Sequence, residues 1–163
     1  MLPGIKILDV KPHYDERGHF SELLRVDWKE FFESESLVQI SLSYSYPGVV
    51  RAWHHHSRGQ VDYFIVIEGA VKVCAYDDRE GSPTRGQMDE IVINGEKPQA
   101  VRVPGYYWHG TKTLGIGPSV TLYAVTKLYD YKNPDEDRRP WNDPAIIDPR
   151  TKQPYDWNKP IHK

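Results

Sequence analysis

Residues 61–76 read VDYFIVIEGAVKVCAY, and this stretch decides the fold class. It contains two runs of β-branched and aromatic residues on either side of Glu68-Gly69, a pattern typical of a β-hairpin. In the second run, Val71, Val73 and Ala75 alternate with the residues between them, as in a strand with one buried face. The sequence therefore predicts two antiparallel strands that pair with each other.

Further strand-like runs recur roughly every 8–12 residues around this stretch. They lie at residues 5–10, 37–45, 91–93, 100–103 and 119–128. A helical pattern occurs over about residues 28–34, where Asp27 offers an acceptor at the N-cap and Glu30 follows three residues later. Many short strands with one helix predict an all-β protein, and a jelly-roll barrel is its natural form.

The last segment of the chain, residues 130–163, differs from the rest because six of the 13 prolines fall in it. This proline content excludes a helix or a central strand. Large apolar side chains predict that the segment wraps the barrel: Trp141, Ile146, Ile147, Tyr155 and Trp157. We expect one domain over residues 1–163, with the barrel over about 4–129 and a proline-rich wrap over 130–163.

The charge balance of the 163-residue chain excludes some partners. It has 21 Lys and Arg against 23 Asp and Glu, a formal net charge of −2, which argues against a nucleic-acid groove. No apolar run approaches the ~18–20 residues of a membrane span, and the first residues lack an apolar signal core. The single cysteine, Cys74, excludes a disulfide within the chain. We expect its side chain to be buried and to serve packing, not to act as a nucleophile. We therefore expect a cytoplasmic protein that binds neither nucleic acid nor membrane.

The run RAWHHH, residues 51–56, holds the highest concentration of side chains able to bind a ligand or transfer a proton, one arginine and three histidines. In a strand, His54 and His56 point to one face and His55 to the other. The spacing of Gly48, His54 and His56, with His109 much later, is similar to the pattern of cupin barrels, in which both halves converge on a central pocket. The sequence therefore predicts that one barrel face receives two imidazoles.

Two kinds of chemistry fit these residues. In one, a divalent metal ion binds His54, His56, Gln60 and His109, although the Gln60 amide would not neutralise the charge of the ion. In the other, His54 acts as a general base, for which an ordinary histidine pKa near ~6.5 is well suited. The residues alone leave both interpretations open.

Seven further patterns match, in order, the motifs of one known family. They are Asp15–Glu22 (DERGHFSE), Gln39 with Ser43, Gly48–His54 (GVVRAWH), Ser82–Gly86 (SPTRG), Val103-Pro104 with His109-Gly110, Tyr123 with Tyr129, and Trp141–Pro144 (WNDP). Over about residues 7 to 149, the chain resembles the dTDP-4-dehydrorhamnose 3,5-epimerase family. The resemblance implies a metal-free cupin jelly roll (a double-stranded β-helix) that acts on nucleotide sugars, usually as a dimer.

The resemblance also implies an activity and a set of site residues. The chain would be an isomerase of carbohydrate and lipopolysaccharide synthesis, a homodimer without cofactor that inverts carbon 3, carbon 5 or both of a nucleotide-diphosphate 4-keto-6-deoxy sugar. His54 would remove the proton next to the ketone, and Tyr129 would return one to the opposite face. The residues expected to bind the substrate are Arg17, Phe20, Glu22, Gln39, Arg51, His109 and Tyr123.

The chain departs from the family at position 62, where Asp62 replaces a lysine that helps to hold the enolate oxygen. A carboxylate there would repel that oxygen, so Arg51 or a protonated His56 would have to supply the positive charge. The late aspartate that orients the base in the family has only a weak counterpart here, Asp156. Two alternatives therefore stay open: a metal-dependent cupin enzyme, such as a dioxygenase or sugar isomerase, and a non-catalytic sugar-nucleotide binding module.

Overall fold

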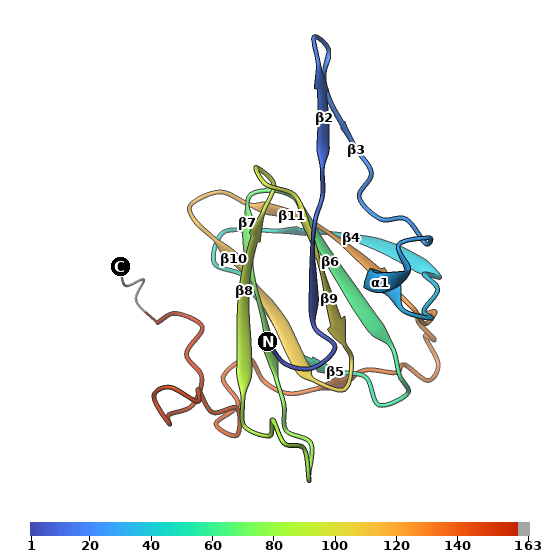
Figure 1. The fold of residues 1–163 in the computed structure, drawn as a ribbon. Coiled ribbons are helices and arrows are strands. Elements are labelled where there is room, and N and C mark those ends of the chain that lie inside the picture. The colour runs from blue at the N-terminus through green and yellow to red at the C-terminus, as the bar shows by residue number, and fades with distance from the viewer. Residues whose placement is uncertain (160–163) are drawn as a thin grey trace.

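The computed structural model describes residues 1–159 and shows an all-β protein with one short helix in that range (Figure 1). The helix, α1, spans Lys29–Phe32. The strands are β1 (Lys6–Asp9), β2 (Pro12–Asp15), β3 (Gly18–Ser21), β4 (Gln39–Ser45), β5 (Val50–His55), β6 (Val61–Glu68), β7 (Ala70–Tyr76), β8 (Met88–Asn94), β9 (Gln99–Pro104), β10 (Trp108–Leu114), β11 (Ser119–Val125) and β12 (Asp137–Arg138). The predicted end of the wrap, residues 160–163, lies outside the described residues.

Two five-stranded antiparallel sheets form the barrel and pack against each other. One has the order β1-β9-β6-β11-β4 and the other β12-β5-β10-β7-β8. The chain passes repeatedly from one sheet to the other, so most neighbours within a sheet are not consecutive in sequence, as in a jelly roll. The predicted all-β jelly-roll class is confirmed.

The predicted hairpin between β6 and β7 is wrong, because these two strands lie in different sheets. β6 pairs with β9 and β11, whereas β7 pairs with β8 and β10. The chain crosses between the sheets at Gly69, which has a positive φ of 73° and where an added Cβ would approach the Pro118 carbonyl oxygen to 2.3 Å. Alternation of apolar residues specifies strands and their buried faces, but not which strands pair.

The core between the sheets explains why β6 reads as a continuous apolar run. Phe64 and Val66 on one face of β6 pack into the cluster that holds Val71 and Val73 of β7. On its other face, Ile65 belongs to a second cluster with the phenylalanines of α1. Each such fully buried side chain contributes about 1.5–3 kcal/mol, so β6 is held from both sides.

The helix α1 forms where the sequence predicts it, but without the predicted cap. Its N-cap is Trp28, with no side-chain hydrogen bond, and the Asp27 carboxylate instead accepts hydrogen bonds from Arg25. Phe31 and Phe32 pack against Tyr63 of β6, edge-on and tilted respectively, with ring centres 5.5 and 4.9 Å away. Packing of these two rings, rather than capping, therefore holds the helix.

Two strand predictions near the later motifs need correction. β10 is missing from the predicted strands because Gly110 interrupts its pattern. The structure explains this glycine: an added Cβ would lie 2.3 Å from the Ala52 Cβ, so the close approach of β10 to β5 requires a residue without a side chain. β11 ends at Val125, so Tyr129 lies beyond the strand on which Tyr123 stands. The missed strand carries His109 into the middle of its sheet.

Near the N-terminus, β2 and β3 form a hairpin that projects from the barrel (Figure 1). We call residues 12–21 the arm. The sequence of residues 13–20 is charged and has neither a helical nor a strand period, which predicts a loop or an edge hairpin, and the hairpin is what forms. The Tyr14 and Phe20 side chains on it are 74% and 69% exposed, so large aromatic surface lies outside the barrel.

The C-terminal segment wraps the second sheet, as predicted from its apolar residues. Tyr155 and Trp157 are buried against Trp53, and the Tyr155 hydroxyl lies 3.1 Å from Cys74 Sγ. Trp53 therefore serves packing. Burial raises the pKa of the Cys74 thiol to about 12, which fits its predicted structural role. Among residues 1–159, no helix has the length and apolar content to cross a membrane.

Glu90 of β8 ties this wrap to the barrel through charge. Its carboxylate lies 2.5 Å from the Arg150 guanidinium and 2.7 Å from Lys159 Nζ, and it accepts a hydrogen bond from the Tyr155 hydroxyl at 2.5 Å. Burial opposes ionisation of Glu90, but these partners outweigh it and lower the pKa to about 2. The folded state therefore binds this proton more weakly than the unfolded chain does.

We expect Glu90→Gln to lower the free energy of unfolding at pH 7 by about 2–3 kcal/mol, the value of the pKa depression. The ionised form contributes fully above the unfolded pKa of about 4.3 and loses that contribution as the pH falls towards 2. Urea denaturation at pH 7 and at pH 3 should therefore show a difference between the two proteins that shrinks in acid. Glu96→Gln, in the exposed loop after β8, is the control and should change little at either pH.

Candidate active site

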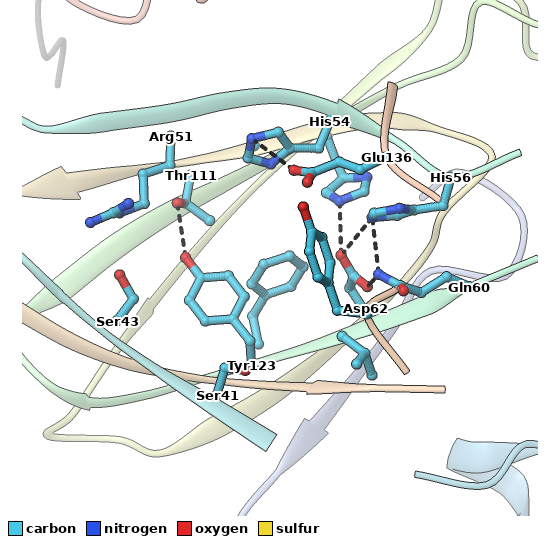
Figure 2. A pocket seen from close by; sticks show the side chains of 15 residues that line it. Ser41, Ser43, Arg51, His54, His56, Gln60, Asp62, Thr111, Tyr123 and Glu136 are labelled. Atoms are coloured by element: carbon cyan, nitrogen blue, oxygen red, sulfur yellow. Dashed lines mark hydrogen bonds and ion pairs between the residues drawn. The ribbon is translucent and has the colours of Figure 1, made fainter. Parts of the chain in front are cut away.

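A cavity of about 270 Å³ lies between the two sheets and contains most of the residues that carry chemistry (Figure 2). Its walls come from β4, β6 and β11 of one sheet and from β5 and β10 of the other. The C-terminal segment closes one side with Glu136. The alternation of β5 places His54 in the cavity lining, whereas His55 stacks on Trp108 outside it at 5.0 Å between rings. The predicted division of the histidine run is thus observed.

His54 is a half-buried imidazole beside a carboxylate, with 31% of its side chain exposed. Its Nε2 lies 3.6 Å from Glu136 Oε1, and its ring centre is 6.2 Å from that of His109, its partner across β5 and β10. Burial, followed by the charge of His109, lowers the pKa of His54 to about 4, so the ring is neutral at neutral pH. Asp156, the weak candidate for orienting His54, does not line the cavity, and its carboxylate accepts a hydrogen bond from the Asn158 backbone.

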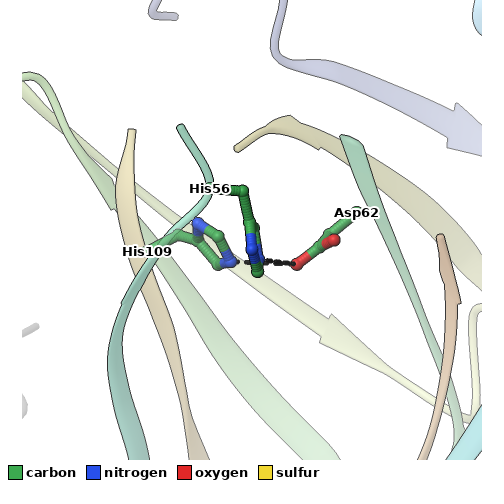
Figure 3. Close-up of side chains that lie close together, drawn as sticks. All are labelled: His56, Asp62 and His109. Atoms are coloured by element: carbon green, nitrogen blue, oxygen red, sulfur yellow. Dashed lines mark hydrogen bonds and ion pairs between the residues drawn. The ribbon is translucent and has the colours of Figure 1, made fainter. Parts of the chain in front are cut away.

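Asp62 is the centre of a buried hydrogen-bond cluster on the cavity floor (Figure 3). Its Oδ2 lies 2.9 Å from His109 Nε2 and 3.3 Å from His56 Nε2, and its Oδ1 accepts a 2.7 Å hydrogen bond from Gln60. Burial opposes ionisation of Asp62, but the bonds from His109 and His56 outweigh it and hold its pKa below the usual range. The residue that departs from the family motif is therefore an ionised partner of two histidines.

The Nδ1 atoms of these two histidines are fixed by backbone carbonyls. His109 Nδ1 donates to the Tyr107 carbonyl at 2.9 Å, and His56 Nδ1 donates to that of Asp135. Both Nε2 atoms therefore face Asp62. Burial disfavours the His56 imidazolium, but the hydrogen bond and charge of Asp62 overcome this and raise the His56 pKa.

The end of the cavity away from Asp62 is polar, and Arg51 there is the permanent cation among the described lining residues (Figure 2). Arg51 Nε donates a 2.9 Å hydrogen bond to Ser45, which keeps the guanidinium beside the serines of β4. Tyr123 projects from β11 with its hydroxyl 3.4 Å from Thr111 Oγ1, and burial raises the pKa of the phenol. This end of the cavity offers hydrogen-bond donors suited to a ligand rich in oxygen.

Tyr129 lines the rim of the cavity from the loop after β11 and is 40% exposed. Its backbone N–H donates a 3.1 Å hydrogen bond to Gln39 Oε1, and its ring contacts that of Tyr131 edge-on at 5.1 Å between ring centres. Gln39 is therefore a support for Tyr129 and does not itself line the cavity.

The cavity brings together most of the residues predicted for the site, but not the N-terminal ones. Those in its lining are His54, Tyr129, Arg51, His109 and Tyr123, with His56 and Gln60 from the alternative metal site. Arg17 and Phe20 lie on the arm, where Arg17 pairs with Asp15, and Glu22 pairs with Arg25 beyond the arm. A single chain therefore leaves four predicted substrate-binding residues outside the lining of its own cavity: Arg17, Phe20, Glu22 and, as a support for Tyr129, Gln39.

Sequence reasoning missed two carboxylates. Asp62 is visible in the sequence as a departure from the family, but its two histidine partners come from a different sheet. Glu136 lies in the irregular wrap, where no periodicity indicates direction, and only the folded chain places it beside His54. A neutral imidazole, two phenols and a guanidinium around one cavity can exchange protons with an oxygen-rich ligand.

Comparison with known proteins gives a consistent result. Residues 1–149 match the family described as dTDP-4-dehydrorhamnose 3,5-epimerase. The chain is 44% identical to a probable low-salt glycan biosynthesis epimerase of Haloferax volcanii, over 99% of this chain and 97% of that protein. It is 37% identical to a spore coat polysaccharide biosynthesis protein of Bacillus subtilis, over 90% and 94%. A solved dTDP-6-deoxy-D-glucose-3,5-epimerase of Legionella pneumophila, in complex with dTDP-4-keto-L-rhamnose, superposes with a TM-score of 0.79 at 30% identity, covering 89% of this chain and 77% of that one.

Loss of the buried Asp62 carboxylate should lower the free energy of unfolding far more than loss of an exposed carboxylate that also binds a histidine. Asp62→Ala leaves two buried histidines without their shared acceptor, so we expect the free energy of unfolding to fall by about 3–5 kcal/mol. Asp137→Ala is the matched control, because Asp137 also binds a histidine, His55, but is 61% exposed, and its loss should cost less than about 1 kcal/mol. Equal losses in urea denaturation would contradict a special role for the buried cluster.

Proposed function

Because the chain belongs to the dTDP-4-dehydrorhamnose 3,5-epimerase family, we propose that His54 takes a proton from the carbon next to the ketone of a nucleotide-diphosphate 4-keto-6-deoxy sugar. The chain is an isomerase of nucleotide sugars in glycan biosynthesis. The proposal concerns how its residues divide the reaction. The observation that carries it is a half-buried, neutral imidazole in a cavity that also holds two phenols and a guanidinium.

The first step is removal of the carbon-bound proton by His54 Nε2 or Nδ1. A proton next to a carbonyl is acidic only when the charge that grows on the ketone oxygen meets a fixed donor. Arg51 is a permanent cation of the described cavity lining, and His109 is a second donor if it is released from Asp62. Glu136, 3.6 Å from His54, favours the imidazolium that forms after proton transfer.

The second step returns a proton from the opposite face of the sugar ring. The sequence motif assigns this to Tyr129, which lines the rim on a loop held by Gln39. Tyr123 is a second candidate, because its hydroxyl lies inside the cavity beside Thr111 and its ring is fixed against Phe64 at 5.1 Å. Inversion requires that acid and base flank the ring, so one of these phenols faces the substrate from the side opposite His54.

We further propose that the working unit is a homodimer. The arm carries Arg17 and Phe20 away from its own cavity, so these residues can bind substrate only if the arm reaches the cavity of a second copy. The edge strand β4 supports pairing, since Ile40 and Leu42 are 65% and 64% exposed on its outer face. A nucleotide that extends beyond the cavity would then meet Arg17 of the partner copy, whose guanidinium suits a diphosphate. We place this dimer in the cytoplasm, a reducing compartment in which the single thiol of Cys74 would stay reduced.

Exchange of the sugar proton with solvent tests the roles directly. In D₂O, the wild-type protein should incorporate deuterium next to the ketone of a dTDP-4-keto-6-deoxyhexose, as followed by NMR. His54→Asn should slow this exchange by about 10²–10⁴-fold with little loss of affinity for dTDP, because it removes the base and not the binding contacts. His55→Asn, which alters the neighbouring ring outside the cavity, is the control and should exchange at the wild-type rate.

The same experiment separates the two phenols. Replacing the tyrosine that returns the proton by phenylalanine should leave deuterium exchange measurable but block inversion of the sugar carbon. Tyr129→Phe and Tyr123→Phe are therefore compared for exchange and for inversion. Full inversion by Tyr129→Phe together with its loss in Tyr123→Phe would transfer the acid role to Tyr123. Binding of dTDP with no exchange by the wild type, for any nucleotide keto-sugar tried, would support a binding module instead of an enzyme.

Complementation tests the dimer. If the arm of one copy completes the cavity of the other, Arg17→Ala and His54→Asn are each inactive alone, but co-expressed chains form mixed dimers with one intact site. Random pairing should restore about a quarter of the wild-type activity. Restoration would not occur if arm and cavity of the same chain formed the site, and a monomeric mass by light scattering would equally exclude the dimer.

A further inference from the structure

The buried residues His56, Asp62 and His109 place two imidazoles around a single carboxylate (Figure 3). We propose that both imidazoles are protonated, so that the cluster carries one net positive charge, and that this charge stabilises the enolate formed when His54 removes the sugar proton. The catalytic part rests on the proposed function, whereas the charge of the cluster does not. Asp62 is then a positioning residue, which acts by holding two imidazolium ions at the cavity floor.

The hydrogen bonds of His109 require a proton on each ring nitrogen. Its Nδ1 lies 2.9 Å from the Tyr107 carbonyl oxygen, and its Nε2 lies 2.9 Å from Asp62 Oδ2. A carbonyl oxygen and an ionised carboxylate can only accept, so both nitrogens donate, and a histidine that donates from both nitrogens is an imidazolium. Asp62 and His109 therefore form a pair with no net charge.

The protonation of His56 sets the net charge of the cluster. Its Nδ1 donates to the Asp135 carbonyl, and its Nε2 lies 3.3 Å from the same Asp62 oxygen that binds His109. The Gln60 amide nitrogen is 3.1 Å from this Nε2 and would donate to it if His56 were neutral, but the shorter bond of that amide, 2.7 Å, goes to Asp62 Oδ1. Burial disfavours the imidazolium, but the bond and charge of Asp62 outweigh it and raise the pKa of His56. The geometry therefore favours a second imidazolium, at His56.

The carboxylates that the C-terminal segment brings near the cluster have cations of their own. The Glu136 carboxylate, which lies beside His54, is also 2.9 Å from the Arg138 guanidinium. The Asp135 carboxylate is 3.5 Å from Arg58 Nε and accepts a 3.0 Å hydrogen bond from the Arg58 backbone N–H. Because each of these two negative charges is paired with an arginine, neither neutralises the cluster.

The cluster lies beside the proposed base. All three of its residues line the cavity, and the ring of His109 is centred 6.2 Å from that of His54. Proton removal by His54 leaves negative charge on the neighbouring ketone oxygen, and a positive charge fixed nearby stabilises it. Arg51, the other cation among the described lining residues, donates to Ser45 at the end of the cavity away from Asp62. The cluster therefore supplies positive charge next to the base, without release of His109 from Asp62.

Nitrogen NMR of the histidine side chains tests the charge without substrate. Long-range proton–nitrogen spectra distinguish an imidazolium, whose two nitrogens both carry hydrogen, from a neutral ring, in which one nitrogen is bare. At about pH 8, above the ordinary histidine pKa of ~6.5, we expect imidazolium signals from His56 and His109, assigned by their loss in His56→Gln and His109→Gln. Asp62→Asn, which removes the shared negative charge, should convert at least one of them to a neutral ring. A neutral His56 or His109 in the wild type would overturn the proposal.

Deuterium exchange into a dTDP-4-keto-6-deoxyhexose tests the catalytic role. His56→Gln removes one charge from the cluster but keeps a side chain that can form hydrogen bonds. We expect kcat for exchange to fall by about 10²-fold with little change in KM, because the charge acts on the enolate more than on the bound ketone. The double variant His56→Gln with Asp62→Lys restores a cation at the cavity floor and should recover most of the lost rate.

His55→Gln is the matched control, since His55 belongs to the same histidine run but stacks on Trp108 outside the cavity. It should keep the wild-type rate and both imidazolium signals. A wild-type rate in His56→Gln would overturn the catalytic role even if the spectrum shows both charges. No exchange by the wild type would contradict the proposed function, while the spectrum would still decide the charge. If circular dichroism shows a variant at position 62 to be unfolded, the wild-type spectrum and His56→Gln decide the two parts of the proposal.

Discussion

The shared carboxylate of Asp62 is the interaction on which the cavity depends. It stands on β6 of one sheet and binds His109 on β10 of the other, with His56 from the end of β5 beside it. A buried charge of this kind is stable only while its partners stay in place, because an unpaired buried carboxylate costs several kcal/mol. The two sheets are therefore fixed to each other at the cavity.

The C-terminal wrap contributes to the site as well as to stability. Its tryptophan and tyrosine rings pack on Trp53, directly before His54 in β5, and Glu90 holds the wrap to β8. An earlier part of the same segment carries Glu136 to His54 and the Asp135 carbonyl to His56. Ordering of the wrap and alignment of the two histidines are thus one structural event, since the same segment makes both sets of contacts.

The residues predicted to bind the substrate lie in two places, the cavity and the arm. The cavity is lined by His54, two tyrosines and Arg51, whereas Arg17 and Phe20 lie on a hairpin outside the barrel. Under the proposed function, the cavity would hold the sugar and the exposed arm of a second copy would contact the diphosphate and base. This division would let one barrel bind a substrate that is longer than its cavity.

The sequence by itself determined most of the strands, the short helix, the apolar wrap, the two faces of the histidine run and the family motifs. These are local properties, because periodicity and residue type depend on near neighbours. Only the tertiary structure decided that β6 and β7 belong to different sheets, that β10 carries His109 between them, and that Asp62 and Glu136 meet histidines. Those contacts join residues 47 and 82 positions apart in the chain, and pairing at such separation is set by packing of whole sheets, which no local pattern records.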